Sequence, residues 1–413
     1  MAQRFGPEAG PLFWQRPEQL LQPEALEHAL SRAAGCWPGL FPELIPEALR
    51  NKKKQLSLLQ VQREPMQGGV SGAHLERLYV KASCQGDSRD HKTLTLPLIF
   101  KRMRPDESWL MRSSGDTRCR EVQLWRHGLL ADMPRALWSP VLAAAYDEQT
   151  REGALLLADM SRWLGTLEDC AAPVPAWQVA QYLDHLARFH AHYWQDERLS
   201  DERYALASVE QTLLMLAPSV IANYLAAGEP HPYLPISRAG WEAFYSTAPP
   251  QALHRLQRVF DAPASLLASA ASAPATLLHG DAWPPNIGAL PGKRRHTRNR
   301  TILIDWALAT AGPATFDPFW LLFAWKRVET RRALSFYRRQ LTCHLARRGI
   351  ALDAGQWQLL LDLGVVRTVM TCGESMGQAV LFARNDAERA QAVSALAWWL
   401  NWAASAIQRR GWD

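Results

Sequence analysis

The sequence predicts an α+β protein of two lobes, in which a small antiparallel β-rich lobe precedes a larger, mainly helical lobe. Residues 55–160 hold short apolar strand patterns separated by turns, and long patterns of helical period follow residue 175. The chain of 413 residues is also longer than one ordinary domain. We therefore expect an N-terminal extension over residues 1–50, an N-lobe over 51–160 and a C-lobe over 161–413.

The N-terminal extension is rich in proline and carries short helical patterns, such as the one over residues 23–30. We expect it to pack onto the first lobe. Nothing in its sequence indicates chemistry.

The first two strand patterns lie at residues 55–62 and 74–80, with a glycine-rich turn between them. Backbone N–H groups in such a turn can approach phosphate oxygens without obstruction by side chains. An ordinary hairpin explains the turn taken alone, because neither Gly-x-Gly-x-x-Gly nor a Walker sequence is present. Its position in the chain before two further features, Lys101 and Glu121, favours phosphate binding. The candidate contact residues are Gly68, Gly69, Ser71 and Gly72.

A third strand pattern ends in Lys101, and Glu121 follows twenty residues later in a segment of helical pattern. Asp116 is the expected N-cap of that helix. Either residue alone would be explained as a surface lysine or a solvated glutamate. Arg118 and Arg120 lie close enough in sequence to compete for the Glu121 carboxylate.

Two further apolar runs, at 136–146 and 153–160, complete five predicted strands, and helical patterns follow. The longest of these lie at 320–348, 356–371 and 387–410. Several polar and aromatic residues of this helical region are expected to be structural. They are His190, Trp398, Trp399 and Trp402. For Asp317 a structural role is implied only by the family resemblance given below.

The most informative stretch is Leu-Leu-His-Gly-Asp-Ala-Trp-Pro-Pro-Asn-Ile at 277–287, followed by Ile-Leu-Ile-Asp-Trp at 302–306. Two apolar runs joined by a turn-rich segment predict a hairpin, which would bring Asp305 beside Asn286. Phosphoryl transfer needs a carboxylate that deprotonates a hydroxyl and oxygen ligands that hold Mg²⁺. We therefore predict Asp281 as the base, with Asn286 and Asp305 as metal ligands.

This stretch resembles the catalytic segment His-Gly-Asp-x-x-x-x-Asn of the aminoglycoside phosphotransferase family, which is likewise followed by a strand ending in Ile-Asp-Trp. That family shares a protein-kinase-like fold with choline kinases and related small-molecule kinases. The spacing matches at every catalytic position. Trp283 and Pro285 replace the His and Gly that the family often has there, which affects the loop shape but removes no proposed ligand. The resemblance covers roughly residues 55–325.

The resemblance implies a bilobal protein-kinase-like fold with ATP and Mg²⁺ between a nucleotide-binding N-lobe and a catalytic, acceptor-binding C-lobe. In such a fold Lys101 contacts the α- and β-phosphates and is held by Glu121. Backbone groups at the lobe junction, with Ala158 and Met160 as candidates, would hydrogen-bond adenine.

The implied reaction moves the γ-phosphoryl group to a hydroxyl of a small molecule. The alternative is a catalytically silent nucleotide-binding module of the same fold. The intact candidates for base, lysine and metal ligands argue against it.

The composition excludes several other classes. The formal net charge is +6, and the one dense run of basic residues lies at 293–300. It lacks interleaved aromatic residues, so a solvated turn is favoured over a nucleic-acid site. No apolar run approaches the ~18 residues of a membrane span, and no signal-peptide core follows Met1. Six scattered cysteines predict buried, reduced thiols without zinc. We expect a soluble cytoplasmic protein with no nucleic-acid or membrane partner.

The acceptor stays open among amino sugars, choline-like amines, sugars and other alcohols. From Leu321 to Asp413, thirteen Lys or Arg face seven Asp or Glu, which argues weakly against a polycationic aminoglycoside. Trp320, Phe323 and Trp325 could form a cage for a quaternary amine, although aromatic residues at helical spacing are more often core. The sequence leaves open the choice between ATP and GTP and the oligomeric state.

Overall fold

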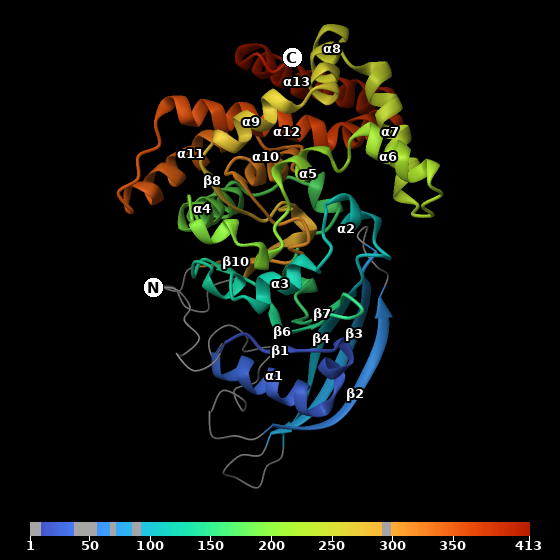
Figure 1. The fold of residues 1–413 in the computed structure, drawn as a ribbon, viewed down its shortest axis with the longest axis vertical. Coiled ribbons are helices and arrows are strands. Elements are labelled where there is room, and N and C mark those ends of the chain that lie inside the picture. The colour runs from blue at the N-terminus through green and yellow to red at the C-terminus, as the bar shows by residue number, and fades with distance from the viewer. Residues whose placement is uncertain (1–9, 37–55, 67–71, 85–91, 291–298) are drawn as a thin grey trace.

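A computed structural model describes residues 10–36, 56–66, 72–84, 92–290 and 299–413. A β-sheet with helix α1 (Pro23–Cys36) against it forms one end of the molecule, and a larger helical part forms the other (Figure 1). The predicted α+β architecture of two lobes is therefore confirmed. Of the predicted glycine turn, Gly68, Gly69 and Ser71 lie outside the described residues, as does most of the basic run.

The sheet contains the five predicted strands and one more. Its strands are β1 (Phe13–Trp14), β2 (Leu56–Met66), β3 (His74–Cys84), β4 (Lys92–Met103), β6 (Val141–Asp147) and β7 (Glu152–Ala158). They lie in the order β1-β6-β7-β4-β3-β2, with β1 parallel to β6 and the other neighbours antiparallel. The additional strand β1 comes from the N-terminal extension.

Strand β6 is packed on both faces, because its small side chains leave room for a helix on each. Successive residues of a strand point to opposite faces. Ala143 and Ala145 accordingly join a core with Leu26 of α1. Ala144 lies in the core that also contains Val122 of α3 (Arg120–Arg126). The described part of the extension thus packs onto the first lobe, and the predicted boundary at residue 50 stays a prediction.

The run at 136–146, expected as one strand, is interrupted at Ser139 and Pro140. Proline lacks the N–H that a continuous ladder requires. Its first part, β5 (Leu137–Trp138), pairs instead with β10 (Arg300–Leu303), which also pairs with β9 (Ile287–Leu290). A third, two-stranded sheet joins β8 and β11. These two strands are β8 (Ala275–Leu278) and β11 (Thr310–Pro313).

Helices build the larger part, and the run expected at 320–348 is split between two of them at residues 325–329. The remaining helices are α2 (Trp109–Ser113), α4 (Ala176–His192), α5 (Val209–Leu214), α6 (Pro218–Ala226), α7 (Tyr233–Thr247), α8 (Pro250–Asp261), α9 (Ala264–Ser272), α10 (Phe316–Ala324), α11 (Thr330–Ala346), α12 (Ala354–Leu381) and α13 (Asp386–Arg410). Short 3₁₀ turns lie at Pro17–Leu21, Leu130–Asp132, Ser161–Trp163, Glu168–Cys170, Glu197–Ser200, Glu202–Tyr204 and Pro284–Asn286.

Helix α12 is central to this part, since it is buried along most of its length. It packs directly on α7: a Cβ atom at Gly377 would lie 1.8 Å from the carbonyl oxygen of Gly240. Two glycines therefore permit the close approach of the two helices. The position of α12 matters for function, because its middle reaches the catalytic segment.

Two expectations about side chains need correction. Cys119 and Cys372 are buried, but Cys170 is half-buried and Cys343 is exposed, so the prediction of buried thiols is wrong for Cys343. Trp399 is buried as expected, whereas Trp398 is 39% exposed. A search of the described helices for one long and apolar enough to cross a membrane found none.

Candidate active site

The catalytic segment forms the predicted hairpin. Strands β9 and β10 are antiparallel, and the N–H of Ile304 donates to the carbonyl of Asn286 at 3.1 Å. Asp305, the next residue, is thereby brought beside Asn286. The Asn286 Nδ2 donates to Asp281 Oδ2 at 2.8 Å and to the Asp281 carbonyl at 3.2 Å. The three predicted polar residues therefore lie together.

Lys101 joins this group from the other lobe. Its Nζ lies 2.7 Å from Glu121 Oε2 and 2.8 Å from Asp305 Oδ1. Strand β4 delivers the lysine and helix α3 the glutamate, while Asp305 comes from the larger lobe. Burial alone would lower the pKa of Lys101, but the carboxylates of Asp305 and Glu121 raise it above its ordinary value. The lysine is therefore a permanent cation between two acids.

The two aspartates of the site differ in their proton affinity. Burial raises the pKa of Asp281 to about 7; the negative charge of Asp305 adds to this, while the Asn286 amide opposes it. Burial also acts to raise the pKa of Asp305, yet the Lys101 ammonium outweighs it and lowers the pKa overall. Asp305 is thus held as an anion, and Asp281 can exchange a proton near neutral pH.

A buried carboxylate fixes the backbone of the catalytic segment. Asp317, in the first turn of α10, accepts hydrogen bonds from the N–H of His279 at 2.8 Å and of Gly280 at 2.9 Å. His190 Nε2 lies 3.1 Å from the same carboxylate. Both Asp317 and His190 are fully buried. They anchor the segment and do not face the reacting groups, in line with the structural role expected for them.

Two residues of the site, Asp305 and Gly280, have a positive φ. Asp305 has φ of 60°, in the left-handed region that residues with a side chain seldom adopt. Such strain is concentrated at functional sites. Gly280 has φ of 82°, and a Cβ atom there would lie 2.0 Å from the carbonyl oxygen of Leu308. Only glycine fits at that position.

His279 connects the two halves of the motif, a role that the sequence did not reveal. Its Nδ1 accepts from the N–H of Asp281 at 3.2 Å, and its Nε2 lies 2.8 Å from the carbonyl of Ile304. A ring that accepts at Nδ1 and donates at Nε2 is neutral. Burial, which lowers the pKa of His279, favours the same form. The one feature of the sequence that could have indicated this role is the position of His279 within the catalytic segment.

Arg120 does not compete for Glu121, contrary to what its position suggested. Its guanidinium is buried and donates to the carbonyls of Ala205 at 2.6 Å, Ser114 at 3.0 Å and Ala307. It therefore ties α3 to the backbone that follows Asp305. Helix α3 itself begins at Arg120, later than expected. Its N-cap is Cys119, so the prediction of Asp116 as the N-cap is wrong, although the Asp116 carboxylate accepts from the Arg120 N–H at 2.9 Å.

Arg367 of α12 is a third buried cation near the site, after Lys101 and Arg120, and its role was not predicted from the sequence. Its Nη2 donates to the Gly280 carbonyl at 3.1 Å, and its guanidinium carbon lies 5.0 Å from the ring centre of Trp320. Its positive charge opposes the rise in the pKa of Asp281. The only sequence signal was a charged residue within the apolar stretch Gly-Val-Val-Arg-Thr-Val-Met.

The remaining predicted nucleotide contacts lie near the junction of the sheet with the larger lobe. Gly72 has φ of 73° and lies against Ser108. The Ala158 N–H already donates to the Pro140 carbonyl at 3.0 Å. Within the described residues no backbone group accepts from the N–H of Met160. The contacts of Ala158 and Met160 with a base stay predictions.

The donor set fits a magnesium ion. Among the described residues no group of three or more His, Cys, Asp or Glu is arranged to hold a metal. Mg²⁺ needs no such cage, because it is usually held by one or two carboxylates together with phosphates and water. The Asp305 carboxylate and the Asn286 amide supply hard oxygen ligands of this kind.

The three aromatic residues proposed as an amine cage face different neighbours. Trp325 packs on Tyr182 with ring centres 5.6 Å apart, and Phe323 packs on Trp399 at 5.9 Å. Trp320 lies beneath Arg367 instead, so these contacts give no cage.

The β-rich lobe, the helical lobe and the sequence family together define a phosphotransferase of the kinase-like fold that acts on small molecules. The model of the ecdysteroid kinase-like family matches residues 75–349, more than half of the chain. The chain belongs to the ecdysteroid kinase-like family. The resemblance to small-molecule kinases that the catalytic segment indicated is therefore confirmed.

Several solved structures are similar at low sequence identity. A macrolide 2'-phosphotransferase from Brachybacterium faecium has 16% identity and a TM-score of 0.35, covering 86% of this chain and 98% of its own. A choline kinase from Streptococcus pneumoniae has 13% identity and a TM-score of 0.35, covering 83% and 94%. For an ethanolamine kinase from Plasmodium vivax the values are 10%, 0.38, 94% and 97%. No functionally curated protein matches the chain.

Proposed function

We propose that this protein transfers the γ-phosphoryl group of ATP, with Mg²⁺ as cofactor, to a hydroxyl of a small-molecule acceptor. The proposal is supported above all by one observation: Lys101 lies within 2.8 Å of both Glu121 and Asp305, and Asn286 connects this group to Asp281. Residues 51–160 would bind the nucleotide and residues 161–413 would supply the acceptor site.

Each residue has a part in this scheme. Asp281 orients the acceptor hydroxyl and takes its proton, which suits a carboxyl whose pKa lies near 7. Lys101, held by Glu121, binds the α- and β-phosphates. Asn286 and Asp305 would hold Mg²⁺, which neutralises charge on the phosphates.

The other predicted contacts belong to the nucleotide. The turn with Gly68, Gly69, Ser71 and Gly72 would cover the phosphates, and backbone groups at Ala158 and Met160 would meet the base. Positioning and charge neutralisation, more than covalent chemistry, account for the rate in such a site.

The first test is an acceptor screen. ADP release from ATP and Mg²⁺ is measured with steroid alcohols, which the family description suggests, beside choline, ethanolamine, amino sugars and simple sugars. Release that depends on one acceptor identifies the acceptor class. Nucleotide binding without stimulation by any acceptor would favour the silent nucleotide-binding module.

Asp281→Asn tests the base. Turnover should be abolished while calorimetric nucleotide affinity stays near the wild-type value, because the base is not a principal nucleotide ligand. Asp261→Asn, an exposed residue at the end of α8, is the matched control and should keep full turnover. Wild-type turnover in Asp281→Asn would remove Asp281 from this role.

Asp305→Ala tests the metal site. Nucleotide affinity in the presence of Mg²⁺ should fall, whereas affinity in the presence of a chelator should change little. An unchanged affinity with Mg²⁺ would exclude Asp305 as a ligand.

A further inference from the structure

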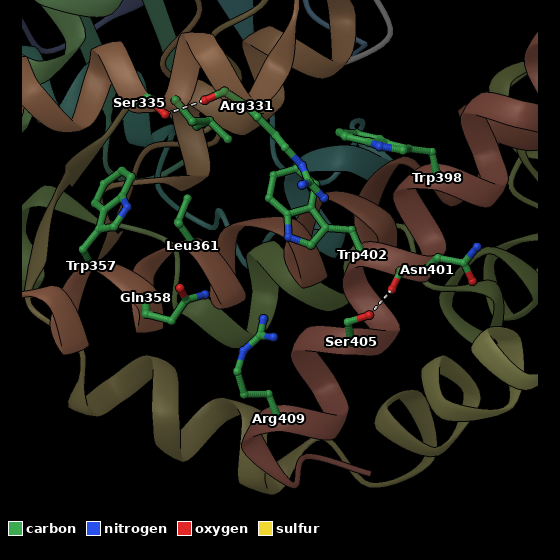
Figure 2. Close-up of a pocket in the computed structure, with 11 residues that line it drawn as sticks. Arg331, Ser335, Trp357, Gln358, Leu361, Trp398, Asn401, Trp402, Ser405 and Arg409 are labelled. Carbon is green, nitrogen blue, oxygen red and sulfur yellow. Dashed lines mark hydrogen bonds between the residues drawn. The ribbon is translucent and has the colours of Figure 1, made fainter.

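A pocket of about 560 Å³ lies between α11, α12 and α13, and Figure 2 shows the side chains around it. None of its lining residues belongs to the candidate active site. Its volume is within the range of about 300–1,000 Å³ that small-molecule sites occupy. The pocket is therefore large enough for a ligand of its own.

Tryptophan side chains form its walls. Trp357 of α12 stands on one side, with Trp398 and Trp402 of α13 on the other (Figure 2). Trp398 and Trp402, which helical spacing predicted to be core, open onto this space. Indole faces stack favourably on flat rings.

The pocket is rich in positive charge. The Arg331 guanidinium carbon lies 5.3 Å from the ring centre of Trp402 and 6.0 Å from that of Trp398. The guanidinium N–H groups of Arg331 have no hydrogen-bond partner among the residues that the structure describes, whereas its backbone N–H donates to Glu329. Arg338 lies over Trp357 at 5.5 Å. Each tryptophan wall thus carries an arginine beside it.

Two carboxylates lie near the pocket, and both already have partners. Glu329 accepts from the backbone N–H groups of Arg331 at 3.2 Å and Arg332 at 2.6 Å. Asp362 is fully buried and accepts from Arg409 at 2.7 Å, Arg410 at 2.7 Å and Gln358 at 2.9 Å. Arg409 and Arg410 thus pair with Asp362, whereas the guanidinium groups of Arg331 and Arg338 lie on tryptophan rings and form no ion pair with a carboxylate of the described residues. No Asp or Glu is present among the described residues that line the pocket itself. The local field favours an anion and opposes a cation.

We propose that this pocket binds a small organic anion built on a flat ring. The ring stacks on the tryptophan faces, and a carboxylate or phosphate on the ring pairs with the Arg331 guanidinium, whose planar fork matches such groups. Arg409 adds positive charge from the opposite side of the pocket (Figure 2). The inference concerns a second site and does not rest on the proposed phosphotransferase function.

The test is isothermal titration calorimetry of the full chain with four probes that separate ring from charge. 1-Naphthyl phosphate and 1-naphthoate carry both features, 1-naphthol carries only the ring, and inorganic phosphate carries only the charge. Both ring anions should bind at least about tenfold more tightly than 1-naphthol or phosphate. The tighter of the two identifies a phosphate ester or a carboxylate as the natural group.

Variants locate the binding. Arg331→Met should weaken both ring anions by about tenfold, and Trp398→Ala should weaken them together with 1-naphthol. Arg332→Met is the matched control, since Arg332 is exposed on the same helix and does not line the pocket. Thermal unfolding of each variant checks the fold. Equal affinity in the Arg331→Met and Arg332→Met proteins would overturn the proposal, as would equal binding of all four probes or no binding of either ring anion.

Discussion

Replacing Glu121 with Gln perturbs the buried ion pair that Glu121 makes with Lys101. The Lys101 and Glu121 side chains are 9% and 1% exposed, so water cannot solvate the Lys101 ammonium group after the glutamate charge is removed. Removing one partner of a fully buried pair costs about 3–5 kcal/mol. Lys101 keeps Asp305 at 2.8 Å, and glutamine can still accept a hydrogen bond. We therefore expect a loss of about 1.5–3 kcal/mol in the free energy of unfolding.

The variant should also lose catalytic activity. Without the glutamate, Lys101 is oriented by Asp305 alone, although the proposed mechanism requires both groups at the phosphates and the metal. A displacement of this kind costs about 10²-fold in turnover. Urea denaturation and acceptor-dependent ADP release measure the two effects.

Glu388→Gln is the control for this experiment. It removes an exposed ion pair with Arg384, in which the arginine side chain is 84% exposed and the glutamate side chain 36% exposed. Water and salt screen such a pair, so the urea midpoint should stay near the wild-type value. If Glu121→Gln and Glu388→Gln unfold at the same urea concentration and turn over equally, burial of the Lys101 pair has no energetic consequence and the reasoning fails.

Three further predictions follow from the site. Gly280→Ala should destabilise the protein by at least about 2 kcal/mol in urea denaturation, and more than Gly228→Ala, since both glycines have positive φ but only the first meets a carbonyl. Arg120→Met leaves buried carbonyls without donors and should cost about 3–5 kcal/mol, against little for the half-buried Arg118→Met; equal unfolding midpoints would contradict this. The raised pKa of Asp281 means that the folded state holds this proton more tightly than the unfolded chain, so stability falls as pH rises from about 4 to 7. Asp281→Asn should remove that fall and be more stable than wild type at pH 8 by about 1–3 kcal/mol, and a wild-type pH profile in the variant would refute the assignment.

The sequence by itself determined the two-lobed fold and the local geometry of the hairpin. Asp281, Asn286 and Asp305 are close in the chain, so strand patterns and a turn were sufficient to bring them together. Lys101 and Glu121 were predicted as a pair through resemblance, because no local pattern links a strand to a helix twenty residues later. The hairpin was thus predicted from residues close in the chain, and the Lys101–Glu121 pair from the known family.

Only the tertiary structure decided which distant residues support the site. Arg120 and Ala307, and likewise Arg367 and Gly280, are far apart in sequence and meet only because the helices pack. The same holds for Trp398. The helical spacing of the tryptophans predicted that it is buried in the core, but it borders an open pocket. Periodicity fixes which face of a helix a residue occupies. What covers that face depends on the packing of other elements, because burial and hydrogen-bond partners are properties of the folded chain.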